Sequence, residues 1–577
     1  MDRRGWSLLA SGALTLALVA SACGGAAAPT ATPARAPAAA ATATTAPPGA
    51  PATPTRAAPV GLGTPTPTRA AVPTVAPVSG GPVGKMTMAA VADVTNLDVH
   101  VATAGGLQYF YTVSDVNAFL LVQQRAGRSD PWLAESWAWD DKGLKVRWVI
   151  RKGARFHDGK PVTADDAKFT AEKIKAPYSA RGVNSGVGRW IKDVQVIDDR
   201  TFVMTAPEVL ATLYATYGGI AIQPRHDPYE VMQKKPIGAG PYRVADWRPF
   251  ESMTLEASPY FWDADKVQVK TIVRLVVPEP ESRLAMLKSG QVDLMDEVQP
   301  RQAEELAKDK RFRVKVTDAG NIASIVFATD TPVIPGTDIP NPFLDARVRR
   351  AFTMAVDRKA IFDGIALGKY GTYVPGPWPR HGYGANTMED KITPYKYDPQ
   401  AARKLLEEAQ FPFDREWGVW YYRTSAGFAE ATEVAVAQWN AIGIKARGRL
   451  TEVGALMSYW QEKPSRTYPI QMIRSLTVDE PPGYIVATEN VPEGTLSQIG
   501  DPKLDEWTIK RRTAFEPAER QKLYEEVYVY EHEQAITFPL LGGVLIHALN
   551  QRVDWDPIPG QMFATHLWKA RWLPGAP

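Results

Sequence analysis

The chain has 577 residues, 22% of them charged, a formal net charge of +3 and one cysteine, Cys23. That single cysteine excludes an intrachain disulfide and an all-cysteine zinc site, and its early position excludes a cysteine nucleophile in the body of the chain. The segment before Lys85 carries five arginines and one aspartate, which leaves a formal charge of −1 for the remainder. A nearly neutral body has no electrostatic footprint for nucleic acid, so we expect no nucleic-acid partner.

Residues 1–22 have the pattern of a secretory signal peptide. Arg3 and Arg4 precede an apolar stretch that is too short to be interpreted first as a membrane span. The four residues ASAC, which end at Cys23, resemble a lipobox, in which the cysteine is diacylated and becomes N-terminal after cleavage. We therefore expect lipidation at Cys23 and an extracytoplasmic protein anchored to the cell membrane, on its periplasmic or outer face.

Residues 23–84 consist almost entirely of Ala, Pro, Thr, Gly and Val. Such a segment cannot bury enough apolar surface to offset its conformational entropy, and its prolines favour extended backbone. We expect a disordered tether. From Lys85 the composition is that of a globular protein, and the remaining length exceeds one typical hydrophobic core, so we expect at least two lobes.

The body begins with an expected strand at 86–91 and a loop at 93–98. The loop lies at the carboxyl end of the strand, where ligand-binding groups of open α/β sheets usually lie. Asn96 is therefore a candidate ligand-binding residue. The alternative is that the loop is an ordinary connector.

The next segment predicts a β-hairpin followed by a helix. Two strands, 137–139 and 144–150, flank a turn that contains Gly143, and we expect them to pair. A turn rich in Asp, Gly and Pro follows, and residues 163–166 have the pattern of a capping box that opens a helix. His157 lies in that turn. Because no second ligand is nearby, we interpret it as structural rather than as a metal ligand.

The later part of the chain alternates between strand and helix patterns. We expect strands at 242–247, 253–257, 269–277, 312–316, 322–328, 419–423 and 444–450, and helices at 281–287, 343–358, 399–406, 430–441 and 516–532. The strand, helix and strand between 419 and 450 form a βαβ unit, which predicts parallel strands.

Five stretches resemble one family when they are taken together and in order. They are LAESW at 133–137, RKGARFHDGKPVTADD at 151–166, PIGAGPYRV at 236–244, FLDARVRRAFTMAVDR at 343–358 and YDPQAARKLL at 397–406. They are similar to motifs of the family 5 extracellular solute-binding proteins, the dipeptide, oligopeptide and nickel receptors of ABC importers. The arginines of the fourth stretch we interpret as solvated or structurally paired rather than as an anion clamp.

This resemblance implies an α/β, two-lobed, periplasmic-binding-protein-like fold. It implies an enlarged first lobe, mixed sheets flanked by helices, and a hinge between the lobes. The first lobe is expected at 85–315, with a subdomain around 110–225. The second lobe is expected at 316–535, and residues 536–577 are expected to return to the first.

The resemblance also implies ligand-binding residues in the second lobe. Tyr421, Tyr422 and Trp460 come from segments that face the cleft in relatives. In peptide-binding relatives the stretch comparable to 473–481 has a Trp, and an Asp that pairs with the α-ammonium group of the peptide.

Counting back from Pro481 puts Arg474 at the position of that Trp and Thr477 at the position of the Asp. A shift of two residues puts Asp479 there instead, and both alignments stay open. A buried guanidinium needs an acidic partner. If Arg474 faces the cleft, that partner is either Asp479 and Glu480 or a carboxylate or phosphate of the ligand.

By this resemblance the chain is expected to capture a peptide-like or other small solute and to deliver it to the permease of an ABC transporter. We expect a monomer with no catalytic residue, no cofactor and no metal. Peptides, metal chelates, oligosaccharides and opines are all bound on this scaffold, and the fold does not choose among them.

Two other classes of protein compete with this interpretation. One is a secreted hydrolase that acts on oligosaccharide or peptide. The chain has no G-x-S-x-G, H-E-x-x-H or P-loop motif. Glu531, His532 and Glu533 point to different helix faces and make a poor metal site. Paired carboxylates of a glycosidase stay open, because they are assembled in three dimensions. The other class is a surface chaperone or adaptor that reuses the scaffold.

Overall fold

The computed structural model describes residues 81–574 apart from 95, 101–113, 126–127, 141–142, 176–184, 212, 228, 377–386, 423–426, 452–467, 477–498 and 558–565. The predicted signal peptide and tether, Cys23, Trp460, Thr477 and Asp479 lie outside the described residues.

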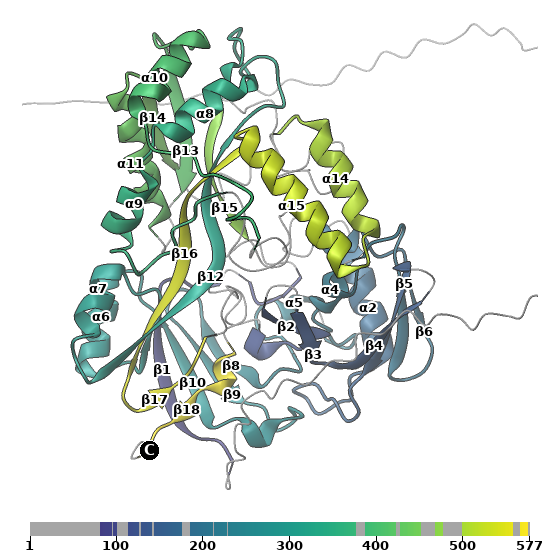
Figure 1. Ribbon diagram of the computed structural model, residues 1–577. Coiled ribbons are helices and arrows are strands. Elements are labelled where there is room, and N and C mark those ends of the chain that lie inside the picture. Colours follow the sequence, from purple (N-terminus) through teal and green to yellow (C-terminus); the bar gives the residue numbers. More distant parts are fainter. Residues whose placement is uncertain are drawn as a thin grey trace, which may run out of the picture. The chain divides into compact units, whose positions relative to one another are not determined.

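Ten of the described strands form one mixed sheet (Figure 1). In sheet order they are β14 (Lys445–Thr451), β13 (Glu416–Tyr422), β15 (Ile470–Leu476), β12 (Phe312–Phe327), β16 (Thr537–Asn550), β11 (Leu294–Met295), β1 (Val83–Ala90), β10 (Val269–Val276), β9 (Ser252–Ala257) and β8 (Tyr242–Arg248). Strand β1 is parallel to β10 and β11, whereas β12 is antiparallel to both β15 and β16. The mixed α/β class predicted from the sequence is confirmed.

A second sheet is built from the predicted hairpin. Its order is β4 (Ala134–Asp140), β5 (Lys145–Ile150), β7 (Thr201–Thr205) and β6 (Asp193–Val196), and β4 and β5 pair antiparallel as expected. Helix α2 (Ala164–Lys175) follows, and its start is fixed because the backbone N–H and the hydroxyl of Thr163 both donate to the Asp166 carboxylate. Two short pairs, β2 (Leu121–Arg125) with β3 (Arg128–Pro131) and β17 (Val553–Asp554) with β18 (Arg571–Trp572), lie outside these sheets.

The remaining described helices are connectors and sheet covers. They are α3 (Ser185–Gly188), α4 (Leu213–Gly218), α5 (Tyr229–Met232), α6 (Pro280–Ser289), α7 (Pro300–Leu306), α8 (Ala346–Met354), α9 (Arg358–Ile365), α10 (Pro399–Glu408), α11 (Phe428–Ala441), α14 (Pro502–Thr513) and α15 (Pro517–Glu533). Helix α10 begins as predicted, because Asp398 accepts from the Ala401 N–H and Pro399 occupies the first helical position. The unit β13–α11–β14 is parallel, as expected.

One expected break in the chain is absent. The sequence predicts two strands, 312–316 and 322–328, with a turn between them, but the structure has the single strand β12 of 16 residues. The prediction was wrong because β16 pairs with β12 on both sides of the supposed turn. The extra residues shift the register between Asp318 and Asn321 as a β-bulge instead of reversing the chain.

The buried apolar residues form separate clusters. The first core includes Met88, Trp148 and Phe202; the second core includes Phe327, Phe352 and Trp439. A third cluster lies under α6 and α7. Strands β12 and β16 contribute to more than one of these clusters, as shown for β16 by Phe538 in the second core and Leu549 in the first. These two strands therefore connect the regions that the cores define.

The end of the chain packs against its described beginning. The Trp572 indole N–H donates to the Val83 carbonyl at 2.8 Å, and the backbone N–H groups of Leu567 and Trp568 donate to the Asp115 carboxylate. Within the described residues, no helix combines the length and apolar character needed to cross a membrane.

Candidate functional site

Three of the residues predicted to bind ligand in the second lobe, Tyr421, Tyr422 and Arg474, lie in strands that end at one edge of the large sheet. Strands β13, β14 and β15 are parallel, so their carboxyl ends lie at the same edge. Tyr421 and Tyr422 end β13, and Arg474 lies two residues before Leu476, the last residue of β15. We call this edge the carboxyl-end edge. Ligands of open α/β sheets bind outside the carboxyl ends of strands, so the topology gives these residues a common location.

Tyr421 and Tyr422 differ in their surroundings although both are buried. The Tyr421 hydroxyl donates to Glu433 Oε1 of α11 at 3.0 Å. Its ring packs against Gly448 of β14, where an added Cβ would lie 3.0 Å from the ring. Successive strand residues point to opposite faces of a sheet. Tyr421 therefore faces α11, and Tyr422 points to the other face.

Arg474 is placed by its backbone alone. It pairs with Ala323 of β12, and two residues later Leu476 pairs with Asn321, next to the bulge in β12. Its side chain lies outside what the structure describes. The roles of Arg474, Trp460, Thr477 and Asp479 remain predictions.

Sequence reasoning missed a glycine pair, Gly542 and Gly543 of β16, which lies across β12 from the end of β15. Gly543 pairs with Asn321, and a Cβ there would overlap the Asn321 side chain; a Cβ on Gly542 would lie 2.7 Å from Thr372. The signal was present, because a Gly-Gly inside an apolar strand marks a bulge or a close backbone approach.

Asn96 is held in the loop that follows β1. Its side-chain oxygen accepts from the backbone N–H of Asp98 at 2.7 Å, a local turn that fits the connector alternative. The loop is anchored through Asp98, whose carboxylate is fully buried and contacts Lys173 Nζ at 2.6 Å and Gln223 Nε2 at 2.9 Å. Burial opposes ionisation of Asp98, but the ammonium group of Lys173 outweighs it and holds the pKa of Asp98 below its usual value.

His157 has the structural role expected for it. Its Nδ1 accepts from the Gly238 N–H at 3.2 Å, and its Nε2 lies 3.0 Å from the Gly240 carbonyl. Burial lowers the pKa of His157 to about 4, so the ring is neutral at pH 7. The histidine thus joins two stretches that the sequence singled out separately.

The arginines of the fourth motif pair with a carboxylate or with backbone carbonyl groups. Arg347 pairs with Asp345 at 2.6 Å. Arg349 and Arg350 donate to the Gln534 and Glu533 carbonyls at the end of α15, where a helix presents unpaired carbonyl groups and a negative dipole end. The structural interpretation fits these contacts.

The end of α15 also carries a carboxyl group with few partners. Glu531 is 2% exposed, Thr537 donates to one of its oxygens at 3.3 Å, and the other oxygen has no hydrogen-bond partner. Burial raises the pKa of Glu531 to about 8. Among the described residues, no group of three or more His, Cys, Asp or Glu side chains is placed to hold a metal ion.

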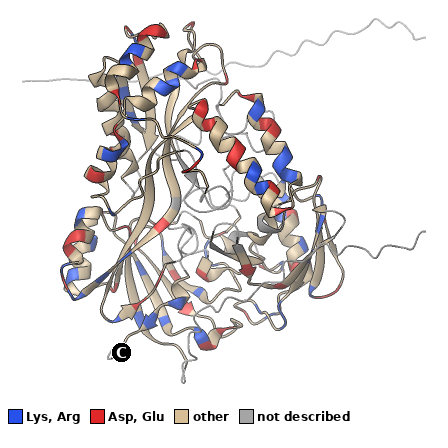
Figure 2. Cartoon of the chain, viewed as in Figure 1, with Lys and Arg blue, Asp and Glu red and all other residues tan. Residues whose placement is uncertain are grey.

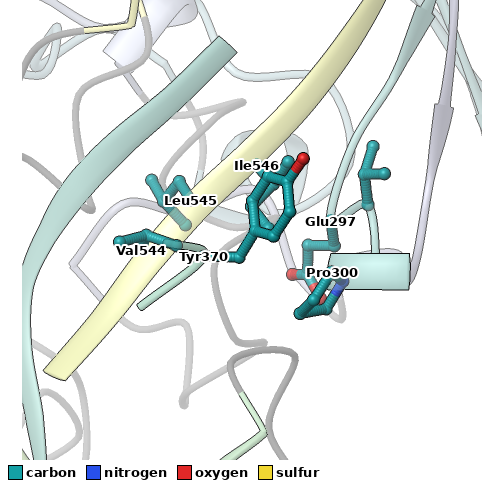
Figure 3. A pocket seen from close by; sticks show the side chains of 7 residues that line it. Glu297, Pro300, Tyr370, Val544, Leu545 and Ile546 are labelled. Carbon is teal, nitrogen blue, oxygen red and sulfur yellow. The ribbon is translucent and has the colours of Figure 1, made fainter. Parts of the chain in front are cut away.

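One small cavity lies where β16 passes the loop before α7 (Figure 3). Its volume is about 10 Å³, and its lining is Glu297, Val298, Pro300, Tyr370, Val544, Leu545 and Ile546. Such a volume holds roughly one water molecule. It is too small to receive a peptide or another solute, so it is no candidate for the ligand site.

The family is established by comparison with known proteins. The family described as bacterial extracellular solute-binding proteins, family 5 (Middle), matches residues 129–488, which is more than half of the chain. The chain belongs to the family 5 bacterial extracellular solute-binding proteins, as the motifs predicted.

Relatives cover most of the chain. Heme-binding protein A of Haemophilus influenzae is 25% identical over 473 residues, 75% of this chain and 83% of that protein. Probable di/tripeptide-binding protein 5 of Pseudomonas aeruginosa is 25% identical over 483 residues, 76% of this chain and 87% of that protein.

Solved structures confirm the fold. The oligopeptide-binding protein AppA of Bacillus subtilis, in complex with a nonapeptide, has a TM-score of 0.72 at 19% identity, covering 85% of this chain and 99% of that one. NikA of Brucella suis, in complex with Fe(III)-EDTA, also has a TM-score of 0.72, at 17% identity. The two-lobed periplasmic-binding-protein fold predicted from the sequence is confirmed.

Proposed function

We propose that the chain is the receptor of an ABC importer that captures a peptide or peptide-like solute at the carboxyl-end edge and delivers it to the permease. The observation that carries the proposal is that Tyr422 at the end of β13 and the backbone of Arg474 near the end of β15 lie at one edge of a sheet in a family 5 fold. The relative from Pseudomonas aeruginosa, a probable di/tripeptide-binding protein, supports the peptide class.

The anchoring and the lobe boundaries form part of this proposal. Lipidation of Cys23 would keep the receptor, as a monomer, at the membrane that holds its permease. We place the lobes at 85–315 and 316–535, with a return at 536–577; residues from Leu549 to Ala570 in the first core support the return.

The test is to identify what the protein binds. Native mass spectrometry of the purified full chain is expected to show a co-purified mass of several hundred daltons. Thermal shift against di-, tri- and longer peptides is expected to raise the Tm for at least one class. If no peptide raises the Tm while a sugar or an opine does, the peptide proposal falls and the receptor class stands.

A second experiment concerns the amine-binding position. A carboxylate that pairs with the α-ammonium group loses its partner when the peptide is N-acetylated. Asp479→Asn and Thr477→Val are therefore compared with both forms of one peptide. If Asp479 occupies the pairing position, Asp479→Asn is expected to abolish the difference between the two forms and Thr477→Val to retain it. If Thr477 occupies it, no carboxylate is present there, and the wild type is expected to bind both forms equally.

A further inference from the structure

The end of α14 makes a contact that joins the two cores away from β12 and β16. Helix α14 packs on the second core through Leu504, with Trp507 beside it. Its last residues then meet the region of the four-stranded sheet, where Trp190 belongs to the first core. We call this meeting the closure contact and define it by Arg512 and Phe515 with Trp139, Gly143, Trp190, Glu208 and Ala211.

Arg512 contributes three interactions to the closure contact. Its carbonyl accepts from the Ala211 N–H at 2.6 Å, its guanidinium lies 3.3 Å from Glu208, and the same group stands 5.4 Å from the centre of the Trp190 ring. The Arg512 side chain is 9% exposed, whereas Glu208 is half exposed. Arg512 belongs to the basic last turn of α14, with Lys510 and Arg511, which is blue in Figure 2.

Phe515 contributes the apolar part. Its ring meets Trp139 edge to face, with the ring centres 5.7 Å apart. It also covers Gly143, the described residue of the β4–β5 turn, so closely that a Cβ at Gly143 would overlap the ring. Phe515 remains 37% exposed. A partly exposed ring that fits a glycine on another core can separate from it at modest cost, unlike a fully buried side chain.

The contact depends on the distance between the cores. Strand β16 runs from the second core to the first, and β12 pairs with it along its length, so both strands persist in any relative position of the lobes. The closure contact, by contrast, exists only when α14 reaches the four-stranded sheet. Hinge-type binding proteins alternate between such positions when they sequester a ligand. A contact that is made only in the closed position raises the population of that position and slows release of whatever is enclosed.

We propose that Arg512 and Phe515 are positioning residues that stabilise the closed form of the receptor without touching the ligand. The Phe515 ring packs against Gly143 in this form. The ligand-release part of this inference rests on the proposed function. Loss of an edge-to-face aromatic contact with its buried area is expected to change the ratio of closed to open molecules about tenfold.

The first measurement needs no ligand. Spin labels on Lys168→Cys in α2 and Lys404→Cys in α10, both exposed, report the distance between the regions in the full chain with Cys23→Ser. Phe515→Ala is expected to lower the closed fraction about tenfold. Glu208→Gln, a milder change at a half-exposed residue, is expected to lower it about threefold.

Gly143 offers a test by rescue. Gly143→Ala is expected to open the protein, because the added Cβ overlaps Phe515, and the same substitution in Phe515→Ala protein is expected to add nothing further. Gly153→Ala is the matched control: Gly153 also has a positive φ, +78° against +88° for Gly143, but has no atom within 4 Å of the added Cβ. The control is expected to leave the distance unchanged.

The second measurement is the release rate of a bound peptide, which is expected to rise about tenfold in Phe515→Ala. Unchanged distances in Phe515→Ala, or equal opening by Gly143→Ala and Gly153→Ala, overturn the closure contact. If the distances change as expected but no peptide binds to any form, the closure contact stands and the proposed ligand falls. If peptides bind and their release is unaffected by Phe515→Ala, Glu208→Gln and Gly143→Ala, the positioning role falls instead.

Discussion

A buried carboxyl group lies at each of the two cores, and the pKa values of the two groups are shifted in opposite directions. Asp98 lies between Leu97 and Val99 of the first core and has Lys173 and Gln223 as partners. Glu531 lies beside the second core with a single threonine hydroxyl. The pKa of Asp98 is lowered by its ammonium partner, whereas burial raises the pKa of Glu531 to about 8. Burial alone neutralises an acid, and a buried acid stays ionised only when a cation is built in beside it.

The largest expected effect comes from removing the cation. Lys173→Met keeps the length of the side chain but leaves Asp98 buried without its charge partner. Breaking a buried pair in this way typically costs about 3–5 kcal/mol. Thermal and denaturant unfolding should show this loss, whereas Lys168→Met, on the exposed face of the same helix, should change the free energy of unfolding by less than about 0.5 kcal/mol. Equal losses in the two variants would contradict the contrast between Asp98 and Glu531.

The second prediction concerns Glu531→Gln, which removes a buried carboxyl group that has no cation beside it. Between its ordinary pKa near 4.5 and its folded pKa of about 8, the folded protein holds a proton that the unfolded chain has released. The contribution of Glu531 to stability is therefore present below pH 4.5 and is lost as the pH rises toward 8. Glu531→Gln should flatten this dependence and stabilise the protein at pH 8 by on the order of 3 kcal/mol.

The control for this prediction is Glu533→Gln, two residues away and exposed. It should leave the slope of stability against pH as it is in the wild type. A Glu531→Gln protein that kept the wild-type slope between pH 5 and 8 would show that Glu531 is ionised in the folded state.

A smaller effect is expected at His157, a buried titratable group with both nitrogens near backbone partners. Burial lowers the pKa of His157 to about 4, whereas an unfolded histidine titrates near 6.5. Its contribution to stability is therefore present above pH 6.5 and is lost as the pH falls toward 4. His157→Phe should cost about 2 kcal/mol at pH 7, because the Gly238 N–H loses its acceptor, and should reduce the loss of stability in acid. His226→Phe, at an exposed histidine, is the comparison; a similar cost there would argue against the buried role of His157.

The sequence predicted best where the signal is local. The β4–β5 hairpin, the Asp398 cap of α10 and the parallel pair β13–β14 all follow from turn residues, caps and short periodicities. Strand β12 was divided wrongly because the residues between Asp318 and Asn321 have turn chemistry, and only the pairing with β16 decides that they form a bulge.

For the candidate site, the sequence predicted which segments contribute but not which side chains contact each other. The family motifs indicated the ends of β13 and β15, and the sheet topology brings these ends to one edge. Sequence reasoning did not anticipate that α11 supplies Glu433 to the Tyr421 hydroxyl, because that pairing depends on how a helix lies across the sheet. The glycine pair of β16 carried a signal in the sequence, but its partner Asn321 follows only from the register.

The most direct test of the receptor proposal is the affinity of one peptide, selected by thermal shift, for the wild-type protein and for Arg474→Ala, measured by calorimetry. Arg447→Ala is the control, because Arg447 is an exposed arginine of β14 that pairs with Glu416. Capture at the carboxyl-end edge predicts that Arg474→Ala weakens binding roughly thirtyfold, the equivalent of about 2 kcal/mol, while Arg447→Ala leaves it unchanged. Equal affinity of the wild type and both variants for the peptide would contradict the assignment of that edge as the binding site.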